Sequence, residues 1–353
     1  MDSAQSLDSQ IQKLQEKMKA ANLPLELSEK INGMIMLLSA SLKQGGSSFI
    51  SYESISSYID WVISLPFEKE TTDILDINSA KAVLDKNHYG LESVKNIILE
   101  YLASIILSMK NNSEDKVIRA PILCLIGLVG TGKTTLAYSI AEALGRKFER
   151  IPFGGMGDAR ALRGQSRAFA DAEPGAIIKK IVNAQSKNSV ILLDELDRVT
   201  ESARSDIMGV LVELLDPEQN KAFTDHYIDY PFDLSHVLFI ATANNTTNIS
   251  TAVLDRLEIV QMPSYTDLEK ETIARKYLFP KIRQGTGLSE TQIVIDDGLW
   301  PAIIRPLGFD SGIRSLERTI QGICRKSARL IVEGKTPQGV HITNENIKEF
   351  LPA

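Results

Sequence analysis

One stretch of the chain combines glycines, a lysine and hydroxyl side chains in a pattern that suits phosphate chemistry. Residues 127–134 read Gly-Leu-Val-Gly-Thr-Gly-Lys-Thr and match GxxxxGK[ST]. Glycines let backbone N–H groups point inward around phosphates, and a helix that begins there adds partial positive charge. Lys133 is expected to reach the β- and γ-phosphates, and the Thr134 hydroxyl to bind Mg²⁺. The predicted phosphate-binding residues are Gly127, Leu128, Val129, Gly130, Thr131, Gly132, Lys133, Thr134 and Thr135.

A glycine-rich structural turn is the alternative for this motif. An apolar run precedes it and a helix is expected from Thr135 to Leu144, which is the strand–loop–helix setting that a phosphate loop requires. This setting favours the phosphate-binding interpretation.

A second candidate is a pair of adjacent carboxylates after a later apolar run. Residues 190–193 read Val-Ile-Leu-Leu, and Asp194 and Glu195 follow directly. Side chains alternate along a strand, so the two acids can take different roles. Asp194 would hold Mg²⁺ through water, while Glu195 would orient and polarise the attacking water. Strand ends often carry acids, so the pair alone is weak evidence for a metal and catalytic site. Its position one strand–helix unit beyond the phosphate loop strengthens that interpretation.

Three further polar residues could complete a site for phosphoryl transfer to water. Asn244 ends the apolar run that starts at Val237, and it could touch the γ-phosphate or the water, or simply form a turn with its neighbours. Arg256 and Arg314 could stabilise charge on a transferring phosphoryl group. From spacing alone, an ordinary surface arginine is the alternative for each.

Short apolar runs that alternate with helical stretches predict the framework that would position these residues. The runs cover residues 122–126, 148–151, 190–193 and 237–241. Such runs indicate an α/β domain with a parallel sheet covered by helices on both faces. After Met262-Pro263 we expect no further strand. Helical stripes at 266–283, 296–305 and 312–333 predict a small, mainly helical lid domain.

The first part of the chain is expected to be helical and to carry no chemistry. Apolar residues at helical spacing, among them Leu7, predict helices at 7–18, 25–42 and 54–63, with a linker at Gly45-Gly-Ser-Ser48. We interpret this segment as a packing or assembly element. The predicted domains are a helical segment at 1–68, an α/β nucleotide-binding domain at 69–262 and the lid at 263–353.

Composition narrows the functional classes. The net charge of −6 gives the chain no global attraction to nucleic acid or anionic lipid. Cys124 and Cys324 are isolated, which argues against a disulfide framework or a CxxC metal site. The start lacks signal-peptide features, and no stretch is long and apolar enough to span a bilayer. We therefore expect a cytoplasmic or organellar-matrix protein without membrane or nucleic-acid partners.

Longer segments give the chain a specific resemblance. From roughly residue 5 to residue 350 it resembles the Lon family of AAA+ proteases. The phosphate loop is shared by many families, whereas the other segments are far more specific. They are Tyr58-Ile-Asp-Trp-Val-Ile-Ser-Leu-Pro66, Asn87-His-Tyr-Gly-Leu-Glu92, Ala120-Pro-Ile-Leu-Cys-Leu125, Ala143-Leu-Gly-Arg-Lys-Phe148, Leu214-Leu-Asp-Pro-Glu-Gln-Asn220, Asp225-His-Tyr227, Pro231-Phe-Asp-Leu-Ser235 and Ile323-Cys-Arg-Lys326.

The resemblance implies a role for each candidate of the α/β domain. Lys133 and Thr134 would form the Walker A pair, and Asp194 and Glu195 the Walker B pair. Asn244 would be the sensor that positions water. ATP and Mg²⁺ are the implied substrate and cofactor.

The resemblance also implies residues that act from outside the phosphate loop. Arg256 would reach the ATP of a neighbouring subunit, and Arg314 would touch ATP from the lid. His88, Tyr89 and Leu91 would line the adenine pocket. The family's usual assembly is a homohexameric ring that unfolds proteins and threads them to a serine–lysine peptidase.

The axial pore loop departs from the family pattern. The family has an aromatic, a bulky aliphatic and a Gly before Ala-Met-Pro-Gly, whereas this chain has Phe169-Ala-Asp-Ala-Glu-Pro-Gly175. The residues expected to grip substrate are Phe169 and Ala170, and Asp171 and Glu173 would add a negative collar. Smaller and acidic side chains bury less apolar surface, so we expect a weaker grip that disfavours acidic substrate segments.

Other departures concern what the sequence does not contain. No serine–lysine, GxSxG or HExxH pattern is present, and only the final helices of the family's N-terminal recognition domain are recognisable. Leu128-Val129 replaces the family's Pro-Pro without altering the phosphate-binding positions. Both chain ends fall near domain boundaries of the family, which suggests an excised fragment.

We therefore expect an ATP-driven unfoldase module of a Lon-type protease that acts in protein quality control. Unfolded or damaged proteins would be its substrates, and the peptidase would lie C-terminal to this chain or act in trans. The alternatives are a free-standing AAA+ chaperone or remodelling ATPase, and a ring scaffold that binds ATP without hydrolysing it. The presence of Glu195 and Arg256 disfavours the scaffold, and the acidic composition disfavours a DNA-acting protein.

Overall fold

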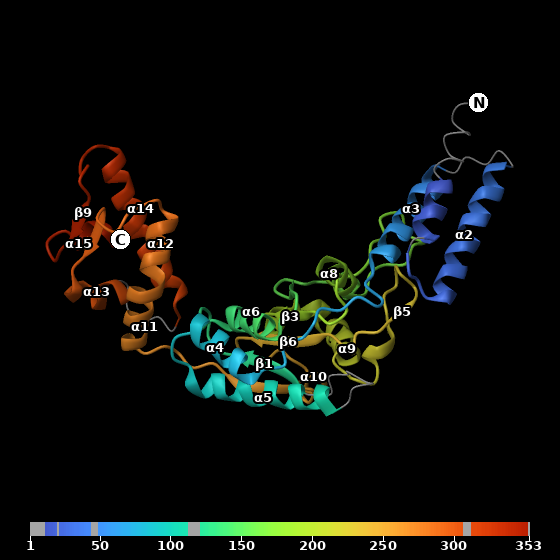
Figure 1. The fold of residues 1–353 in the computed structure, drawn as a ribbon, viewed down its shortest axis with the longest axis horizontal. Helices are drawn as coiled ribbons and strands as arrows, with labels where there is room; N and C mark the ends of the chain where they lie inside the picture. Colours follow the sequence, from blue (N-terminus) through green and yellow to red (C-terminus); the bar gives the residue numbers. More distant parts are fainter. Residues whose placement is uncertain (1–10, 20, 44–48, 112–120, 306–311, 352–353) are drawn as a thin grey trace.

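The fold is that of a computed structural model, which describes residues 11–19, 21–43, 49–111, 121–305 and 312–351. The chain is elongated, with an α/β domain in the middle, long helices of the N-terminal segment at one end and the lid at the other (Figure 1). Within these ranges, no helix has the length and apolar character that crossing a bilayer requires.

Five parallel strands form the central sheet in the order β2–β3–β6–β1–β7. The strands are β1 (Ile122–Ile126), β2 (Phe148–Pro152), β3 (Val190–Asp194), β6 (Leu238–Ala243) and β7 (Leu257–Gln261). The four predicted runs are all strands, and the predicted parallel α/β sheet is confirmed. The edge strand β7 contains polar as well as apolar residues, and the sequence analysis did not give its residue range. Because β1, β3 and β6 lie in the interior of the sheet, their sequences are almost wholly apolar.

Helices cover both faces of the sheet. On one face, α4 (Ile77–Asn87), α5 (Glu92–Asn111) and α6 (Lys133–Leu144) pack against strand residues that include Leu123. On the other, α8 (Ala176–Ala184) and α9 (Arg204–Leu214) share a core with Cys124. Burial raises the pKa of the Cys124 thiol to about 12, in keeping with a small apolar core residue.

The N-terminal segment is helical, as predicted. A helix at 11–19 precedes α2 (Leu25–Lys43) and α3 (Phe49–Ser64). Leu7 and the predicted linker at 45–48 lie outside the described residues. The apolar sides of these helices belong to the same hydrophobic core as α8 and α9. The segment is therefore packed into the α/β domain, and its boundary at residue 68 stays a prediction.

The lid has its own core and contains the three predicted helical stretches. Residues 267–285 form α11 (Asp267–Ile273), a π-helical turn η4 (Ala274–Leu278) and α12 (Phe279–Gly285), and α13 (Trp300–Ile304), α14 (Arg314–Val332) and α15 (Ile347–Phe350) follow. The expectation of no strand after Met262-Pro263 is wrong, because β8 (Ile293–Ile295) pairs in parallel with β9 (Val340–Ile342). Three residues are too few for a local pattern, and the pairing partner is remote in the sequence.

A buried ion pair fastens the segment between the N-terminal helices and the α/β domain. Arg146, just after α6, donates from Nε and Nη2 to the two carboxylate oxygens of Asp73, at 2.8 and 2.7 Å. Its Nη1 donates to the carbonyl of His236, 3.1 Å away. The Arg146 side chain is 1% exposed and that of Asp73 11%. The pair is thus held away from water with both partners satisfied.

Substitution of Arg146 by Ala should destabilise the α/β domain strongly. Removing one partner of a buried pair leaves the other charge without compensation, which costs about 3 kcal/mol or more. Chemical denaturation of the two proteins measures the loss. Arg329→Ala is the matched control, because the Arg329–Glu333 pair lies on the surface and should contribute little. Equal losses for both variants would contradict the assignment.

Candidate nucleotide site

Three neighbouring strands end at one edge of the sheet and bring the predicted site residues together. The phosphate loop follows β1, Asp194 ends β3, and Asn244 follows β6. Because the order is β3–β6–β1, these strand ends are adjacent. Lys133 Nζ donates to Asn244 Oδ1 at 3.2 Å, although the two residues are 111 positions apart. The loop, the acidic pair and Asn244 thus share one site, at the edge where parallel α/β sheets bind ligands.

The phosphate loop has the backbone that a cradle for anions requires. Gly130 has a φ of +84°, which side-chain-bearing residues rarely adopt. Thr131 Oγ1 donates to the Leu128 carbonyl at 2.9 Å and stiffens the loop. Helix α6 begins at Lys133, two residues before the predicted start, so its first N–H groups face the loop. The side chains of Leu128 and Val129 are exposed.

Lys133 lies beneath the loop with its ammonium surrounded by oxygen atoms. Its Nζ donates to the carbonyls of Gly127 at 2.6 Å and Leu128 at 2.9 Å, besides Asn244. Burial lowers the pKa of Lys133, whereas Asp197, Asp194 and Glu195 act in the opposite direction. These carboxylates help to keep a partly desolvated ammonium charged.

The carboxylate of Asp194 is buried and held by two side chains. Thr242 Oγ1, on the neighbouring strand β6, donates to Asp194 Oδ1, and Arg150 Nε donates to Oδ2 at 2.6 Å. Thr242 was not predicted, because an isolated Thr in the apolar run of β6 gives no signal. Together with the Thr134 hydroxyl, Asp194 offers oxygen donors of the kind that Mg²⁺ prefers. The residues present therefore fit a magnesium ion.

Glu195 leaves the strand in a left-handed conformation, with a φ of +61°. Its N–H donates to Thr242 Oγ1 at 3.0 Å, so one threonine holds both acids. The Glu195 carboxylate lies 3.3 Å from the guanidinium of Arg198 and is about one-third exposed. A non-glycine residue held at positive φ is strained, and such strain clusters at functional sites. The two carboxylates have different partners, and their division of roles stays a prediction.

Asn244 is oriented by a residue that the sequence analysis missed. Asp197 accepts from the Asn244 N–H at 3.1 Å and from Asn244 Nδ2 at 3.3 Å. These bonds direct the amide oxygen of Asn244 toward Lys133, where it accepts a hydrogen bond. Asp197 is buried in the short 3₁₀ turn η1 (Leu196–Arg198) after the acidic pair. Its closeness in sequence to Asp194 and Glu195 is the signal that could have identified Asp197 as a site residue.

Arg256 does not reach this site within its own chain. It precedes β7, and its carbonyl accepts from the N–H of Ile122, the first residue of β1. Arg256 therefore lies at the amino-terminal ends of the strands, roughly 15 Å along β1 from the phosphate loop, which follows the carboxyl end of that strand. Its guanidinium is held by Asp216 Oδ2 at 3.0 Å and by the Ala252 carbonyl at 2.8 Å.

The lid contacts the phosphate loop where α14 begins. The N–H of Ile313 donates to the Gly130 carbonyl at 3.0 Å, and a side chain at Gly130 would lie 3.3 Å from Arg314 Cβ. Arg314 is thus placed beside the loop, with an exposed side chain. The contact of Arg314 with ATP stays a prediction.

The predicted adenine-pocket residues form the corner between α4 and α5. His88 is buried and lies 2.9 Å from Ser139 Oγ of α6, and Leu91 is buried with a φ of +58°. Tyr89 is part-exposed, and its ring faces Tyr277 of the lid at 6.3 Å between centroids. Two aromatic rings from two domains could flank a planar base. Tyr277 was missed, because a lone Tyr in a helical stretch carries no signal.

The predicted pore residues lie away from this site, in the loop between α7 (Arg160–Arg163) and α8. Phe169 is 59% exposed, and Ala170 and Asp171 are exposed as well. Glu173 pairs with Lys179 of α8 at 2.5 Å, so part of the predicted negative collar is compensated. The bias against acidic substrates stays a prediction, which Asp171 now chiefly carries.

Comparison with known proteins agrees with this geometry. Residues 123–265 match the family model of the ATPase family associated with various cellular activities, AAA. Residues 284–340 match the Lon protease AAA+ ATPase lid domain. The chain is 42% identical over 344 residues to the Lon protease of Lawsonia intracellularis, covering 98% of this chain and 40% of that protein. It is 43% identical over 348 residues to the Lon protease of Clostridioides difficile, covering 98% and 43%.

The parallel sheet, the phosphate loop and the attached helical lid define an AAA+ ATPase domain. The chain belongs to the Lon family, of which it is an AAA+ ATPase portion. It spans about two fifths of the length of these curated relatives.

The buried imidazole of His88, between α4 and α5, should make stability depend on pH. Burial lowers the pKa of His88 from 6.5 to about 4, so the folded protein binds this proton less readily than the unfolded chain does. The contribution of neutral His88 to stability is full above pH 6.5 and is lost as the pH falls toward 4. Denaturation midpoints of the native protein should therefore fall faster over this range than those of His88→Gln, which cannot titrate. Parallel curves would show that His88 titrates normally.

Proposed function

We propose that this chain binds Mg²⁺–ATP and hydrolyses it to unfold and translocate polypeptides, as the motor of a Lon-type ATP-dependent protease. The observation that carries the proposal is the convergence of Lys133, Asp194, Glu195 and Asn244 at one sheet edge, with Arg314 of the lid beside them. The match to a Lon-type lid and the Lon relatives supports the choice among AAA+ functions.

The phosphates of ATP would take the place that the loop carbonyls now hold at Lys133. The Lys133 ammonium and the first N–H groups of α6 would bind them, and Thr134 and Asp194 would hold Mg²⁺. When bound, Mg²⁺ neutralises charge that develops on the phosphates. Tyr89 and Tyr277 would flank the base, and this would couple the lid to the occupied site.

Glu195 is the residue proposed to polarise the attacking water. Its carboxylate is part-exposed and separated from Asp194 by the turn at residue 195. Asn244, fixed by Asp197, would hold the water in line with the γ-phosphate. This arrangement favours turnover over a scaffold that only binds ATP, because such a scaffold needs neither residue.

A second copy of the chain would complete the site. Arg256 lies at the edge of the sheet opposite its own phosphate loop, so it can serve only the ATP of a neighbour. Asp216 holds the guanidinium in one direction. A closed ring, which we propose to be a hexamer, satisfies every such interface. Phe169 and Ala170 would then grip a polypeptide in the axial pore, with a peptidase joined to the motor or acting with it.

Substitution of Glu195 by Gln should separate binding from hydrolysis. The amide keeps the size of the side chain but cannot polarise water, so turnover should fall at least about a hundredfold while ATP still binds. Phosphate release and fluorescent-nucleotide binding measure the two properties. Glu100→Gln, which changes an exposed acid on α5, is the control and should hydrolyse ATP normally. Unchanged turnover in Glu195→Gln would refute the catalytic assignment.

Mixing two inactive variants should restore activity if Arg256 acts in trans. Arg256→Ala chains keep an intact phosphate loop, and Lys133→Ala chains keep the finger. In randomly mixed rings, about a quarter of the interfaces would join one intact half from each and hydrolyse ATP. Native mass spectrometry would establish that mixed rings form. If they form and no activity returns, the site is not shared between chains.

A further inference from the structure

The loop that carries Phe169 is anchored twice, and one of its anchors belongs to the N-terminal helices. The loop runs from Gly164 to Gly175, between α7 and α8. Its role in gripping polypeptide rests on the function proposed above. Contacts at its base and at its tip hold this loop in place.

The base of the loop is closed by the buried carboxylate of Asp225. Asp225 Oδ2 accepts from the N–H of Gly175 at 2.7 Å, and Gln165 donates across the base to the Glu173 carbonyl at 3.1 Å. A side chain at Gly175 would meet the Leu162 carbonyl at 1.9 Å, so the two ends of the loop are in close contact. The same Asp225 accepts from the N–H groups of Tyr227 and Ile228, which places the turn at 225–229 against the loop base.

The tip of the loop is a tight turn that exposes Phe169. The N–H of Phe169 donates to the Ser166 carbonyl at 3.1 Å, and that of Ala172 to the Phe169 carbonyl at 3.3 Å. Arg167 lies within this turn and is half-buried, while its neighbours Ser166 and Ala168 are exposed. The burial of Arg167 indicates that its side chain packs against another part of the protein.

Arg167 is tied to the N-terminal helices. Its guanidinium carbon lies 4.0 Å from the ring centroid of Tyr58 on α3, a close cation–π contact. Its Nη1 lies 3.7 Å from the sulfur of Met34 on α2. A planar guanidinium stacks on an aromatic face in a way that a lysine ammonium cannot reproduce.

Tyr58 is itself fixed to the base of the loop. It is fully buried, its OH donates to the Ile228 carbonyl at 3.1 Å, and its ring lies 6.1 Å from that of Tyr227. Lys30 of α2 adds bonds to the carbonyl and carboxylate of Asp229 at 2.7 and 2.6 Å. The helices α2 and α3 thus contact both the turn at 225–229 and the loop tip, and the turn in turn contacts the loop base through Asp225.

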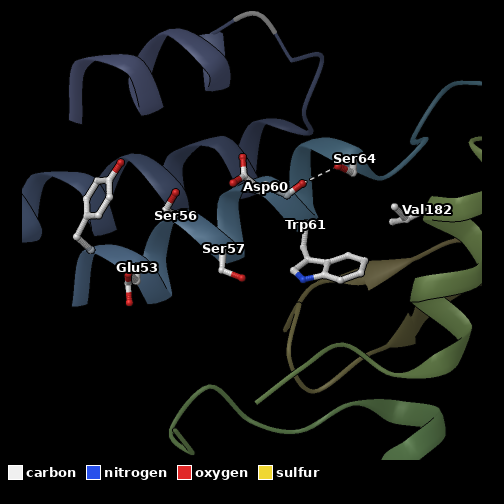
Figure 2. A pocket seen from close by; sticks show the side chains of 8 residues that line it. Glu53, Ser56, Ser57, Asp60, Trp61, Ser64 and Val182 are labelled. Atoms are coloured by element: carbon white, nitrogen blue, oxygen red, sulfur yellow. Dashed lines mark hydrogen bonds between the residues drawn. The ribbon is translucent and has the colours of Figure 1, made fainter. Parts of the chain in front are cut away.

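Other residues of α3 line an open hollow at the protein surface. This hollow of about 500 Å³ is bordered by α3, including Trp61, and by Val182 of α8 (Figure 2). Its other lining residues are Tyr52, Glu53, Ser56, Ser57, Asp60 and Ser64. The contact between α3 and the loop tip is made by Tyr58 and Arg167.

We infer that Arg167 is a positioning residue that clamps the pore loop to helices α2 and α3, and that this clamp sets how firmly the loop holds polypeptide. The N-terminal helices then act as part of the substrate-gripping apparatus. The clamp holds the loop tip at Arg167 while leaving Phe169 exposed. A force applied to Phe169 by a threaded chain would be transmitted to α3 through Tyr58.

The test compares Arg167→Ala with the native protein in two measurements. Hydrogen exchange followed by mass spectrometry reports the mobility of residues 164–175. Fluorescence anisotropy reports the binding of labelled, reduced and carboxymethylated α-lactalbumin, an unfolded polypeptide, in the presence of a slowly hydrolysed ATP analogue. Loss of the cation–π contact should raise exchange in the loop and raise the half-saturating polypeptide concentration, each by roughly tenfold.

Matched variants separate the clamp from general damage. Arg160→Ala removes an exposed arginine of α7 that pairs with Asp158, and it should change neither measurement. Arg167→Lys keeps the charge and should recover only part of the native binding. Tyr58→Phe keeps the ring that faces Arg167 but loses the bond to the Ile228 carbonyl, so it should raise loop exchange less than Arg167→Ala does. In a Tyr58→Leu background, Arg167→Ala should add little, because the two residues act through one contact.

Unchanged exchange in Arg167→Ala would overturn the inference, and so would raised exchange with native polypeptide binding. Phe169→Ala distinguishes these failures from failure of the proposed function. If Phe169→Ala binds polypeptide as the native protein does, the loop does not grip substrate and the proposed pore role fails, whatever Arg167 does. If Phe169→Ala binds weakly and Arg167→Ala binds normally, the pore role holds and the clamp is refuted.

Discussion

An ammonium group that is largely removed from water must be surrounded by oxygen atoms, and the site is organised around this requirement at Lys133. Two loop carbonyls and the amide of Asn244 bind the ammonium directly, and three carboxylates lie close enough to influence its pKa. These groups come from the ends of β1, β3 and β6, which only the strand order makes adjacent. The order of the sheet is therefore what allows one buried cation to be satisfied and still available to phosphate.

Much of the α/β domain was predictable from local patterns. Interior strands must be apolar on both faces, so β1, β3 and β6 can be predicted from continuous apolar runs. The phosphate loop can be predicted from the spacing of its glycines and lysine. The lid strands β8 and β9 were not predictable, since each gains its identity from a partner far along the chain. Thr242, Asp197 and Tyr277 were missed for a related reason. Each is an ordinary residue that becomes part of the site through a contact with another element.

The N-terminal helices share a hydrophobic core with the α/β domain, and polar and aromatic contacts reinforce this packing at a few points. The bidentate pair of Arg146 and Asp73 fastens the connecting segment, and Tyr58 and Lys30 fasten the N-terminal helices to the turn at 225–229. On the other side, the lid has a core of its own and also packs on the α/β domain, because Tyr265 and Ile273 are buried in the same core as Leu123. The N–H of Ile313 adds a bond to the Gly130 carbonyl of the phosphate loop. Both the N-terminal helices and the lid are thus packed onto the α/β domain, and the lid adds a separate core.

The point at which the chain enters the lid has a mechanical consequence. The lid chain departs at Met262, whose N–H donates to the carbonyl of Ile126 at 2.6 Å, directly before the phosphate loop. Any rotation of the lid would therefore pivot beside the phosphate loop. Tyr277 and Arg314 both belong to the lid, and in the proposed function one would lie near the base of a bound nucleotide and the other near its phosphates. A single rotation about Met262 would then loosen both contacts at once, so exchange of ADP for ATP would need no separate opening at either end.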